Sequence, residues 1–316
     1  MNVLACDLGG TRIKVGIVRD GVVFAQTAAP ANSKAGLAPS LPVLKAAWLR
    51  LLEESQLPLV HCAGISVAFP SLVDTKSGRV LAEYGKYADA MSLDLRAWAK
   101  QELNLPLAIE NDARMALVGE WKCGAGRGAD NVVMITLGTG LGTAAIIQGQ
   151  LLRGQHGQAG VLGGHSTVRY GGRACSCGNI GCAEAEASTA FLGDLARTNP
   201  EFATSRLATE PNLDFAAVFK QATAGDSAAI KLRDHSVLVW STLAVNMIHA
   251  YDPEVVILGG GIMASHEIIL PAVSDHVRRH AHTPWGKVQV VASKLGDTAA
   301  LVAGEWLLRE QFPELK

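Results

Sequence analysis

Residues 2–18, NVLACDLGGTRIKVGIV, decide the fold of this chain. Residues 2–8 form an apolar run that ends in an acid and two glycines, and residues 12–18 alternate as a half-buried strand does. This pattern predicts a hairpin around the sequence GGT. It starts again at residues 131–147, where NVVMITL predicts a strand, GTGLG a turn and TAAII a second strand. The repeated hairpin predicts two related α/β domains.

Further helices and strands follow each hairpin. Residues 41–55 have helical spacing, with Leu44, Trp48, Leu51 and Leu52 on one face. The other predicted elements are a buried strand over residues 62–69, a long helix over 226–251, and strands over 254–258 and 287–293. Strands that alternate with helices support the α/β class.

The chain is long enough for two domains, because its 316 residues are 49% hydrophobic and can fill two sizeable cores. Residues 298–308 are apolar at helical spacing and could pack back on the first domain. We therefore predict an N-terminal domain over residues 1–118, completed by the C-terminal helix 298–316, and a C-terminal domain over residues 119–297 that faces it across a cleft.

Charge and hydropathy limit the kinds of partner. The formal net charge is -1, with lysine and arginine scattered, which argues against a nucleic-acid or membrane-surface binder. No stretch approaches the roughly 18 uninterrupted apolar residues of a membrane span, and the first residues lack the pattern of a signal peptide. We expect a cytoplasmic protein whose partners are small molecules or other subunits.

Residues 165–184, HSTVRYGGRACSCGNIGCAE, predict a metal site. Cys175, Cys177 and Cys182 lie among glycines that let the backbone turn, and His165 lies ten residues upstream of the first cysteine. Thiolates and imidazole are the ligands that zinc prefers, and four of them leave no open position for a reactive water. We predict a structural zinc ion. The alternatives are reduced cysteines clustered by chance and a redox pair.

Three glycine-rich turns at the ends of predicted strands suggest a nucleotide site. They are residues 7–11 (DLGGT), 138–142 (GTGLG) and 259–261 (GGG). Such glycines let backbone N–H groups approach an anion where a side chain would collide. None fits the GxxxxGKS or GxxxxGKT phosphate loop, and GTGLG lacks the spacing of a dinucleotide fingerprint. Glycines that only make tight hairpins are the alternative explanation.

Five segments, in order along the chain, resemble the ROK family of sugar kinases and sugar-responsive repressors. They are DLGGTRIKVGIV (7–18), ENDARMALVGE (110–120), TLGTGLGTA (136–144), HSTVRYGGRACSCGNIGCAE (165–184) and DPEVVILGGGI (252–262). The resemblance implies the actin-like ATPase fold, with two RNase H-like domains closing on ATP and a sugar, and a zinc knuckle. It also implies a homodimer. On this basis we expect an ATP-dependent kinase that phosphorylates a hydroxyl of a hexose or hexose-like sugar.

The resemblance implies roles for individual residues. The sugar would be bound by Asn111, Asp112, His165 and Glu184, with the second ring nitrogen of His165 on zinc beside the three cysteines. ATP would be bound by Gly9, Gly10, Thr11, Lys14, Gly138, Thr139, Gly140, Gly142, Gly259, Gly260 and Gly261. Asp7 would help to place Mg2+, which offsets the charge of the phosphates.

Asp112 is the candidate general base. Phosphoryl transfer needs a group that accepts the proton of the attacking hydroxyl, and Asp112 follows an apolar run and precedes a predicted helix. A carboxylate need not be strongly basic at rest, because it accepts the proton as the oxygen bonds to phosphorus. An ordinary helix N-cap, for which Asn and Asp are preferred, is the alternative role.

The chain departs from the family pattern near the expected sugar. Leu162 stands where family kinases carry the glutamate of ExGH, Ser71 follows Pro70 where they carry Pro-Gly, and residues 84–98 differ from their Asn-Leu segment. The identity of the sugar therefore stays open, and a catalytically silent sugar sensor is the alternative function. We do not expect a DNA-binding repressor, because too few residues precede Asp7 for a helix-turn-helix segment. The zinc knuckle argues against an actin-like ATPase that uses no sugar.

Overall fold

The computed structural model describes residues 1–82 and 84–315. They form two compact units. Unit 1 comprises Met1–Arg127, Arg153–Ala159 and Asp297–Lys316, and unit 2 comprises Gly128–Leu152 and Gly160–Gly296. The boundary expected near residue 118 falls inside helix α3 (Asp112–Cys123), and unit 1 continues past the end of that helix.

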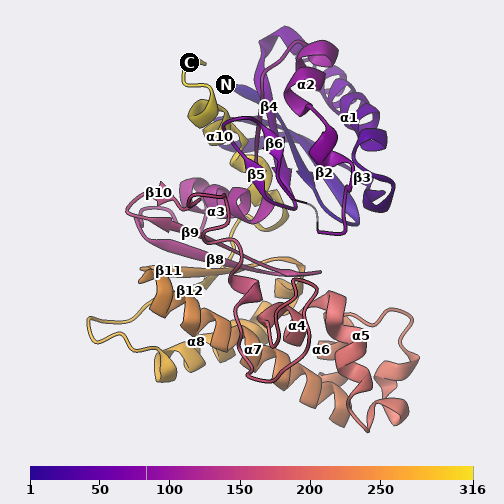
Figure 1. Ribbon diagram of the computed structural model, residues 1–316, viewed down its shortest axis with the longest axis vertical. Coiled ribbons are helices and arrows are strands. Elements are labelled where there is room, and N and C mark those ends of the chain that lie inside the picture. The colour runs from indigo at the N-terminus through magenta and orange to yellow at the C-terminus, as the bar shows by residue number, and fades with distance from the viewer. Residues whose placement is uncertain (83, 316) are drawn as a thin grey trace. The chain divides into compact units, whose positions relative to one another are not determined.

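The sheet of unit 1 has the strand order β3-β2-β1-β4-β7 (Figure 1). The predicted hairpin is present, since β1 (Asn2–Leu8) and β2 (Arg12–Arg19) pair antiparallel, and β3 (Val22–Pro30) adds a third antiparallel strand. The strands β4 (Cys62–Phe69) and β7 (Leu107–Asn111) follow with parallel pairing on the other side of β1. The carboxyl ends of these three parallel strands lie at one edge of the sheet, where α/β proteins place their ligands.

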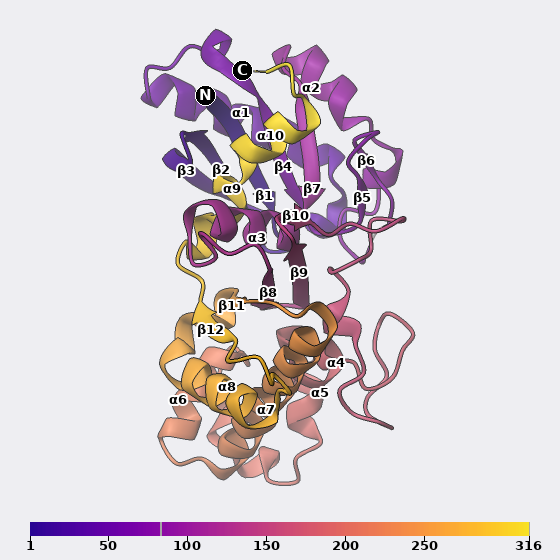
Figure 2. The same cartoon turned by 90° about the vertical axis from the view of Figure 1, so that its left-hand side faces the viewer.

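Helices cover both faces of this sheet (Figure 2). One face packs against α1 (Leu41–Glu54) and α2 (Leu95–Leu103), and the four predicted apolar positions of α1 are buried there. Trp48 of α1 is fully buried, and its indole N–H donates to the backbone oxygen of Ala5 at 3.1 Å. A small hairpin of β5 (Val73–Asp74) and β6 (Arg79–Val80) completes the unit's strands.

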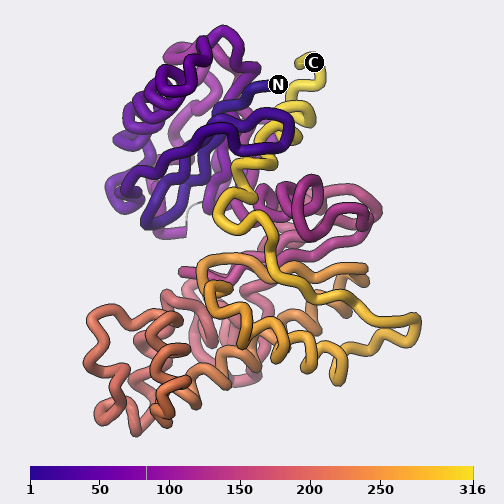
Figure 3. Tube along the Cα trace, turned by 180° about the vertical axis from the view of Figure 1, so that it is seen from behind, coloured from indigo at the N-terminus to yellow at the C-terminus, as the bar shows by residue number. Residues whose placement is uncertain are grey.

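The end of the chain covers the opposite face. The predicted helix over residues 298–308 is present as two helices, α9 (Ala299–Val302) and α10 (Gly304–Gln311), which contact β1 and β4. Figure 3 shows these yellow helices against the indigo strands of the first residues. Helix α3 packs tightly on α9, because a Cβ atom at Gly119 would lie 2.0 Å from the backbone oxygen of Ala299.

Unit 2 contains a sheet of the same design, with the order β10-β9-β8-β11-β12. The second predicted hairpin is β8 (Val132–Leu137) and β9 (Leu141–Ile147), extended antiparallel by β10 (Gln150–Leu151). The strands β11 (Val255–Gly259) and β12 (Gln289–Ala292) add parallel to β8. In both units the third, second, first, fourth and fifth strands of the sheet are neighbours in that order, as a repeated fold requires.

The helices of unit 2 are α4 (Ala183–Ala187), α5 (Thr189–Arg197), α6 (Phe215–Thr223), α7 (Ser227–Tyr251) and α8 (His266–His280). The predicted long helix is α7, which Asp226 caps by accepting from the backbone N–H of Ala229. Its buried face shares one core with β8 and β11 (Figure 1). Among the described residues, no helix combines the length and the hydropathy of a membrane span.

The contact at Gly119 gives a stability test. Gly119→Ala would force α3 away from α9, so we expect a loss of about 1–3 kcal/mol, seen as a lower melting temperature in calorimetry. The matched control is Gly193→Ala in α5, where the nearest atoms to an added Cβ are those of the Arg197 guanidinium at 3.6 Å. That variant should be unchanged or up to about 1 kcal/mol more stable, because alanine favours a helix over glycine. Equal melting temperatures for Gly119→Ala and wild type would contradict the close packing.

Candidate functional site

The four predicted zinc ligands of unit 2 lie together. Their ligand atoms are all within 4.8 Å of one another. Sγ of Cys175 lies 3.6 Å from Nδ1 of His165, and Sγ of Cys177 lies 3.7 Å from Sγ of Cys182. Zinc–sulfur and zinc–nitrogen bonds of about 2.3 and 2.0 Å place neighbouring ligands of a tetrahedron about 3.5–3.8 Å apart. The donor set and its spacing therefore fit a closed zinc site.

Glu184 links the zinc loop, residues 165–182, to the glycine turn after β8. Its Oε2 accepts from the backbone N–H of Leu141 at 2.9 Å, and its Oε1 lies 4.0 Å from Nδ1 of His165. A Cβ atom at Gly140 would lie 2.5 Å from the same carboxylate. A side chain at residue 140 would therefore displace the end of the Glu184 side chain, which is 17% exposed.

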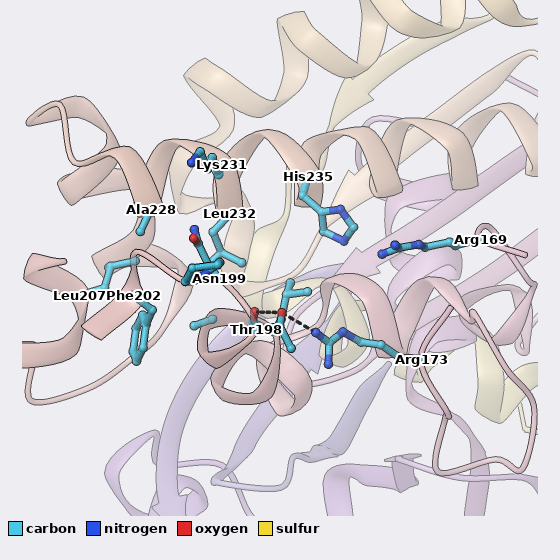
Figure 4. Close-up of a pocket in the computed structure, with 13 residues that line it drawn as sticks. Arg169, Arg173, Thr198, Asn199, Phe202, Leu207, Ala228, Lys231, Leu232 and His235 are labelled. Atoms are coloured by element: carbon cyan, nitrogen blue, oxygen red, sulfur yellow. Dashed lines mark hydrogen bonds between the residues drawn. The ribbon is translucent and has the colours of Figure 1, made fainter. Parts of the chain in front are cut away.

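Glu186 of α4 holds the zinc loop through a hydrogen bond from Arg173. This carboxylate is fully buried and accepts from the backbone N–H of Arg173 at 2.8 Å, with Nη1 of Arg169 and Nε2 of His235 each 3.4 Å away. The two arginines line a cavity of about 340 Å3 together with residues of α7, and Arg173 donates to Oγ1 of Thr198 in its wall at 2.8 Å (Figure 4). His235 thus contacts α4, the helix that carries Glu184 and Glu186.

In unit 1, the predicted phosphate turn follows β1. Gly9 is required by the turn itself, since a Cβ there would lie 2.5 Å from the backbone oxygen of Arg12. Nζ of Lys14 pairs with Oδ2 of Asp7 at 3.2 Å and with Oδ1 of Asp297 at 3.1 Å. Asp297 was not predicted from sequence, because it lies 283 residues from Lys14. Thr11, the last residue of the turn, is exposed.

The start of α3 orients Asp112. The N-cap of this helix is Asn111, whose Oδ1 accepts from the backbone N–H of Arg114 at 3.2 Å. Oδ1 of Asp112 accepts from the backbone N–H of Ala113 at 2.8 Å and from Nδ2 of Asn111 at 3.1 Å. Its Oδ2 has no hydrogen bond within the described part of the chain. The capping role is thus filled by Asn111, and one oxygen of Asp112 is left to accept a proton.

The electrostatic setting of Asp112 suits a general base. Burial is the main cause that raises the pKa of this carboxyl, and the negative charge of Asp7 adds to it, to a value of about 6. Burial also raises the pKa of Asp7, although Lys14 lowers it. Two carboxylates near one another in a partly desolvated place resist ionisation, and such shifts gather at functional sites.

A buried ion network holds the residue before the Asn-Asp pair. Glu110 is fully buried, accepts from Nε of Arg153 at 2.7 Å and lies 3.3 Å from Nη1 of Arg114. Nη2 of Arg114 donates to the backbone oxygens of Gly157 and Ala159 at 3.1 and 2.8 Å. These bonds fix β7 to the start of α3 and so fix Asp112. Sequence analysis quoted this segment but did not find the network.

Sequence analysis also missed Lys86. A Cβ atom at Gly10 would lie 2.9 Å from Cε and 3.3 Å from Nζ of this lysine. Residues 84–98 depart from the family pattern, and this difference was visible in the sequence. The sequence alone does not show that the segment approaches the turn after β1.

The other glycines of the predicted nucleotide turns in unit 2 differ in how closely they are packed. Gly260 has a φ of 90° and approaches Leu137 so closely that a Cβ would lie 2.3 Å from its backbone oxygen. By contrast, an added Cβ at Gly261 meets nothing within 4 Å, and one at Gly138 meets only a backbone oxygen at 3.9 Å. Local packing explains Gly260 and leaves the other two free for a ligand role. Gly142 lies within β9, opposite Thr136.

The sequence model of the ROK family matches residues 3–311. The chain belongs to the ROK family. A glucokinase from Thermotoga maritima is 30% identical over 319 residues, which cover 99% of this chain and 98% of that one. A xylose repressor from Bacillus subtilis is 26% identical over 80% of this chain and 62% of the repressor. The predicted family is thereby confirmed.

A ROK family glucokinase from Streptomyces griseus, solved with glucose and AMPPNP, is 27% identical, with a TM-score of 0.78 over 98% of this chain and 100% of that chain. This likeness confirms the predicted ROK fold with its two mixed α/β sheets.

The zinc assignment can be tested at an exposed ligand. Cys177→Ser should lower the zinc content from about one ion per chain and lower the melting temperature, because structural zinc binding contributes folding free energy. Cys177 is exposed, so its loss creates no core cavity. Cys123→Ser, outside the cluster, should keep its zinc in the same elemental analysis. Full zinc occupancy in Cys177→Ser would refute the four-ligand site.

The raised pKa of Asp112 predicts a stability gain on neutralisation. The folded state holds this proton more tightly than the unfolded chain, so the ionised carboxylate destabilises the fold as pH rises from about 4 to above 6. Asp112→Asn should therefore be more stable than wild type at pH 7.5, by up to about 2–3 kcal/mol, and similar at pH 4.

The control is Asp226→Asn. Burial raises the pKa of Asp226, but hydrogen bonds from Ala229, Arg206 and Ser205 outweigh it and lower the pKa. Asp226→Asn should therefore be less stable than wild type at pH 7.5. Thermal unfolding at both pH values checks the pair, and a destabilised Asp112→Asn at pH 7.5 would contradict the assignment.

Proposed function

We propose that this protein is an ATP-dependent sugar kinase in which Asp112 is the general base. The observation that carries the proposal is the setting of Asp112, whose Oδ2 is free within the described residues and whose pKa is raised to about 6. A base with a pKa near the working pH combines the ionised form with useful proton affinity. Kinase names among the ROK relatives support the same reaction class.

In the proposed reaction, a sugar hydroxyl attacks the γ-phosphorus of ATP. The bond from that oxygen to phosphorus forms while the bond to the bridging oxygen of ADP breaks, and Oδ2 of Asp112 takes the hydroxyl proton. Positioning and charge stabilisation supply most of the catalysis in such transfers. The hydrogen bonds from Ala113 and Asn111 to Oδ1 hold the carboxylate in one orientation. We therefore assign Asn111 an orienting role as well as the sugar contact that the family resemblance implies.

Asp7 is the residue that we propose to hold Mg2+. A carboxylate oxygen is the ligand that this ion prefers, and Oδ1 of Asp7 has no hydrogen bond or ion pair within the described residues, while Oδ2 pairs with Lys14. The ion would supply charge neutralisation at the phosphates. In unit 1, the turn after β1 would give backbone N–H groups to the phosphates. In unit 2, we propose nucleotide contacts for Gly138 and Gly261, where an added Cβ has open space.

The sugar contacts that we propose from unit 2 are His165 and Glu184. Zinc on Nδ1 of His165 leaves Nε2 for a sugar hydroxyl, and Leu141 holds the Glu184 carboxylate in place. Leu162 is half-buried just before the short helix Gly163–His165 and offers no hydrogen bond from its side chain. We therefore propose a hexose-like acceptor that needs fewer polar contacts than glucose does in family members with the glutamate. The homodimer implied by the family remains a prediction.

Coupled-assay ADP formation across hexoses, hexosamines, ketoses and glycosides tests the function. Wild type should turn over with one sugar class, and kcat/KM should rise with pH to a plateau above about 6, because only ionised Asp112 accepts the proton. Asp112→Asn should lose at least about 100-fold in kcat. Asp94→Asn, at the start of α2, is the control and should keep its activity. Silence of wild type on every sugar, with ATP bound, would favour the silent sensor instead.

A further inference from the structure

Lys86 lies against the phosphate turn of unit 1. Its Cε and Nζ occupy the space beside Gly10 that a side chain would otherwise fill. Within residues 1–82 and 84–315, no carboxylate pairs with its amine. Lys14, the lysine expected from sequence to meet the nucleotide, is instead engaged by both Asp7 and Asp297. Lys86 is therefore the less engaged of the two lysines near this turn.

The backbone at Lys86 is fixed by the next residue. Tyr87 is fully buried with a φ of 55°, and its hydroxyl donates to the backbone oxygen of Gly9 at 2.9 Å. Its N–H donates to the oxygen of Ser33 at 2.7 Å, and the Ser33 hydroxyl donates to the oxygen of Gly10 at 2.9 Å. These bonds join the lysine segment to both glycines of the turn. A surface lysine that only aids solubility needs no such anchor.

Asp7 and Asp112 place negative charge near the turn, and a bound triphosphate there needs a cation to offset the repulsion. The positive charge of Lys86 acts on both Asp7 and Asp112 and favours their ionised forms. A triphosphate that approaches this turn adds further negative charge close to two carboxylates. At the short distances of a partly desolvated site, that repulsion is large unless a fixed positive charge offsets it.

We propose that Lys86 contacts the γ-phosphoryl group of bound ATP and stabilises its charge during transfer. The proposal rests on the kinase function above and adds a catalytic residue to it. A lysine ammonium suits this position, because it is a compact charge with three donors that can follow the phosphoryl oxygens. Lys86 lies in the segment, residues 84–98, that departs from the family pattern, so the proposed contact is not one that the family pattern implies.

The test compares Lys86→Met and Lys86→Arg with Lys34→Met, a control that removes an exposed lysine of the neighbouring loop. Lys86→Met should lower kcat about 100- to 1000-fold, with the sugar KM within roughly twofold of wild type. Lys86→Arg keeps the positive charge, so its kcat should be at least about tenfold higher than that of Lys86→Met. Calorimetry should show ATP bound roughly tenfold or more weakly by Lys86→Met, with ADP affinity unchanged.

The two readouts separate this proposal from the kinase function. Equal ATP and ADP affinities in Lys86→Met and wild type, or an equal loss for both nucleotides, would overturn the γ-phosphoryl contact even where wild type is an active kinase. A wild type that binds ATP but phosphorylates no sugar would refute the kinase function, and the ATP-over-ADP difference would still decide the role of Lys86. An unchanged melting temperature of Lys86→Met excludes unfolding as the cause.

Discussion

The parallel pairing of β1, β4 and β7 is the constraint on which the site of unit 1 depends. It brings the end of β1, with Asp7, and the end of β7, with Asn111, to one edge of the sheet. The helix that starts there places a second carboxylate, Asp112, near the first. Their repulsion and their burial oppose ionisation, so the arrangement weakens the fold. Proteins keep such groups together where chemistry needs them. The network around Glu110 and the tight packing of α3 on α9 then hold the arrangement in place.

Unit 2 repeats this topology and uses it differently. Its glycine turns also follow the parallel strands β8 and β11, but the nearby polar groups are fixed by the zinc loop rather than by an ion network in the sheet. Glu184 of α4 accepts from the turn after β8, and Glu186 of the same helix accepts from Arg173 of the loop. In the proposed function, a closed zinc site would influence the chemistry only through position. Loss of the metal would then release the proposed sugar contact at His165 without removing any reacting group.

Sequence patterns predicted the parts of the fold that depend on local periodicity. The two hairpins, α1, β4 and α7 lie within two residues of their predicted bounds, because each has a clear apolar period. Helices α2, α5 and α6 are short, and their signal was not recognised. The zinc ligands were predictable because three of the four lie within eight residues. Lys86, Asp297 and the Glu110–Arg153 pair depend on contacts between distant segments, which a single sequence does not reveal.

The glycines of the three turns show that a sequence motif does not by itself identify which residues bind a ligand. Gly9 and Gly260 are explained by close backbone approaches, so packing alone would keep them, whereas a Cβ at Gly140 would only meet the end of the Glu184 side chain. Gly138 and Gly261 have open space where a side chain would stand. A glycine motif therefore mixes residues kept for the turn with residues kept for the ligand. In unit 1 the same turn leaves room at Gly10 for the lysine of another segment. A glycine turn is thus a place where the side chain of a distant segment can lie.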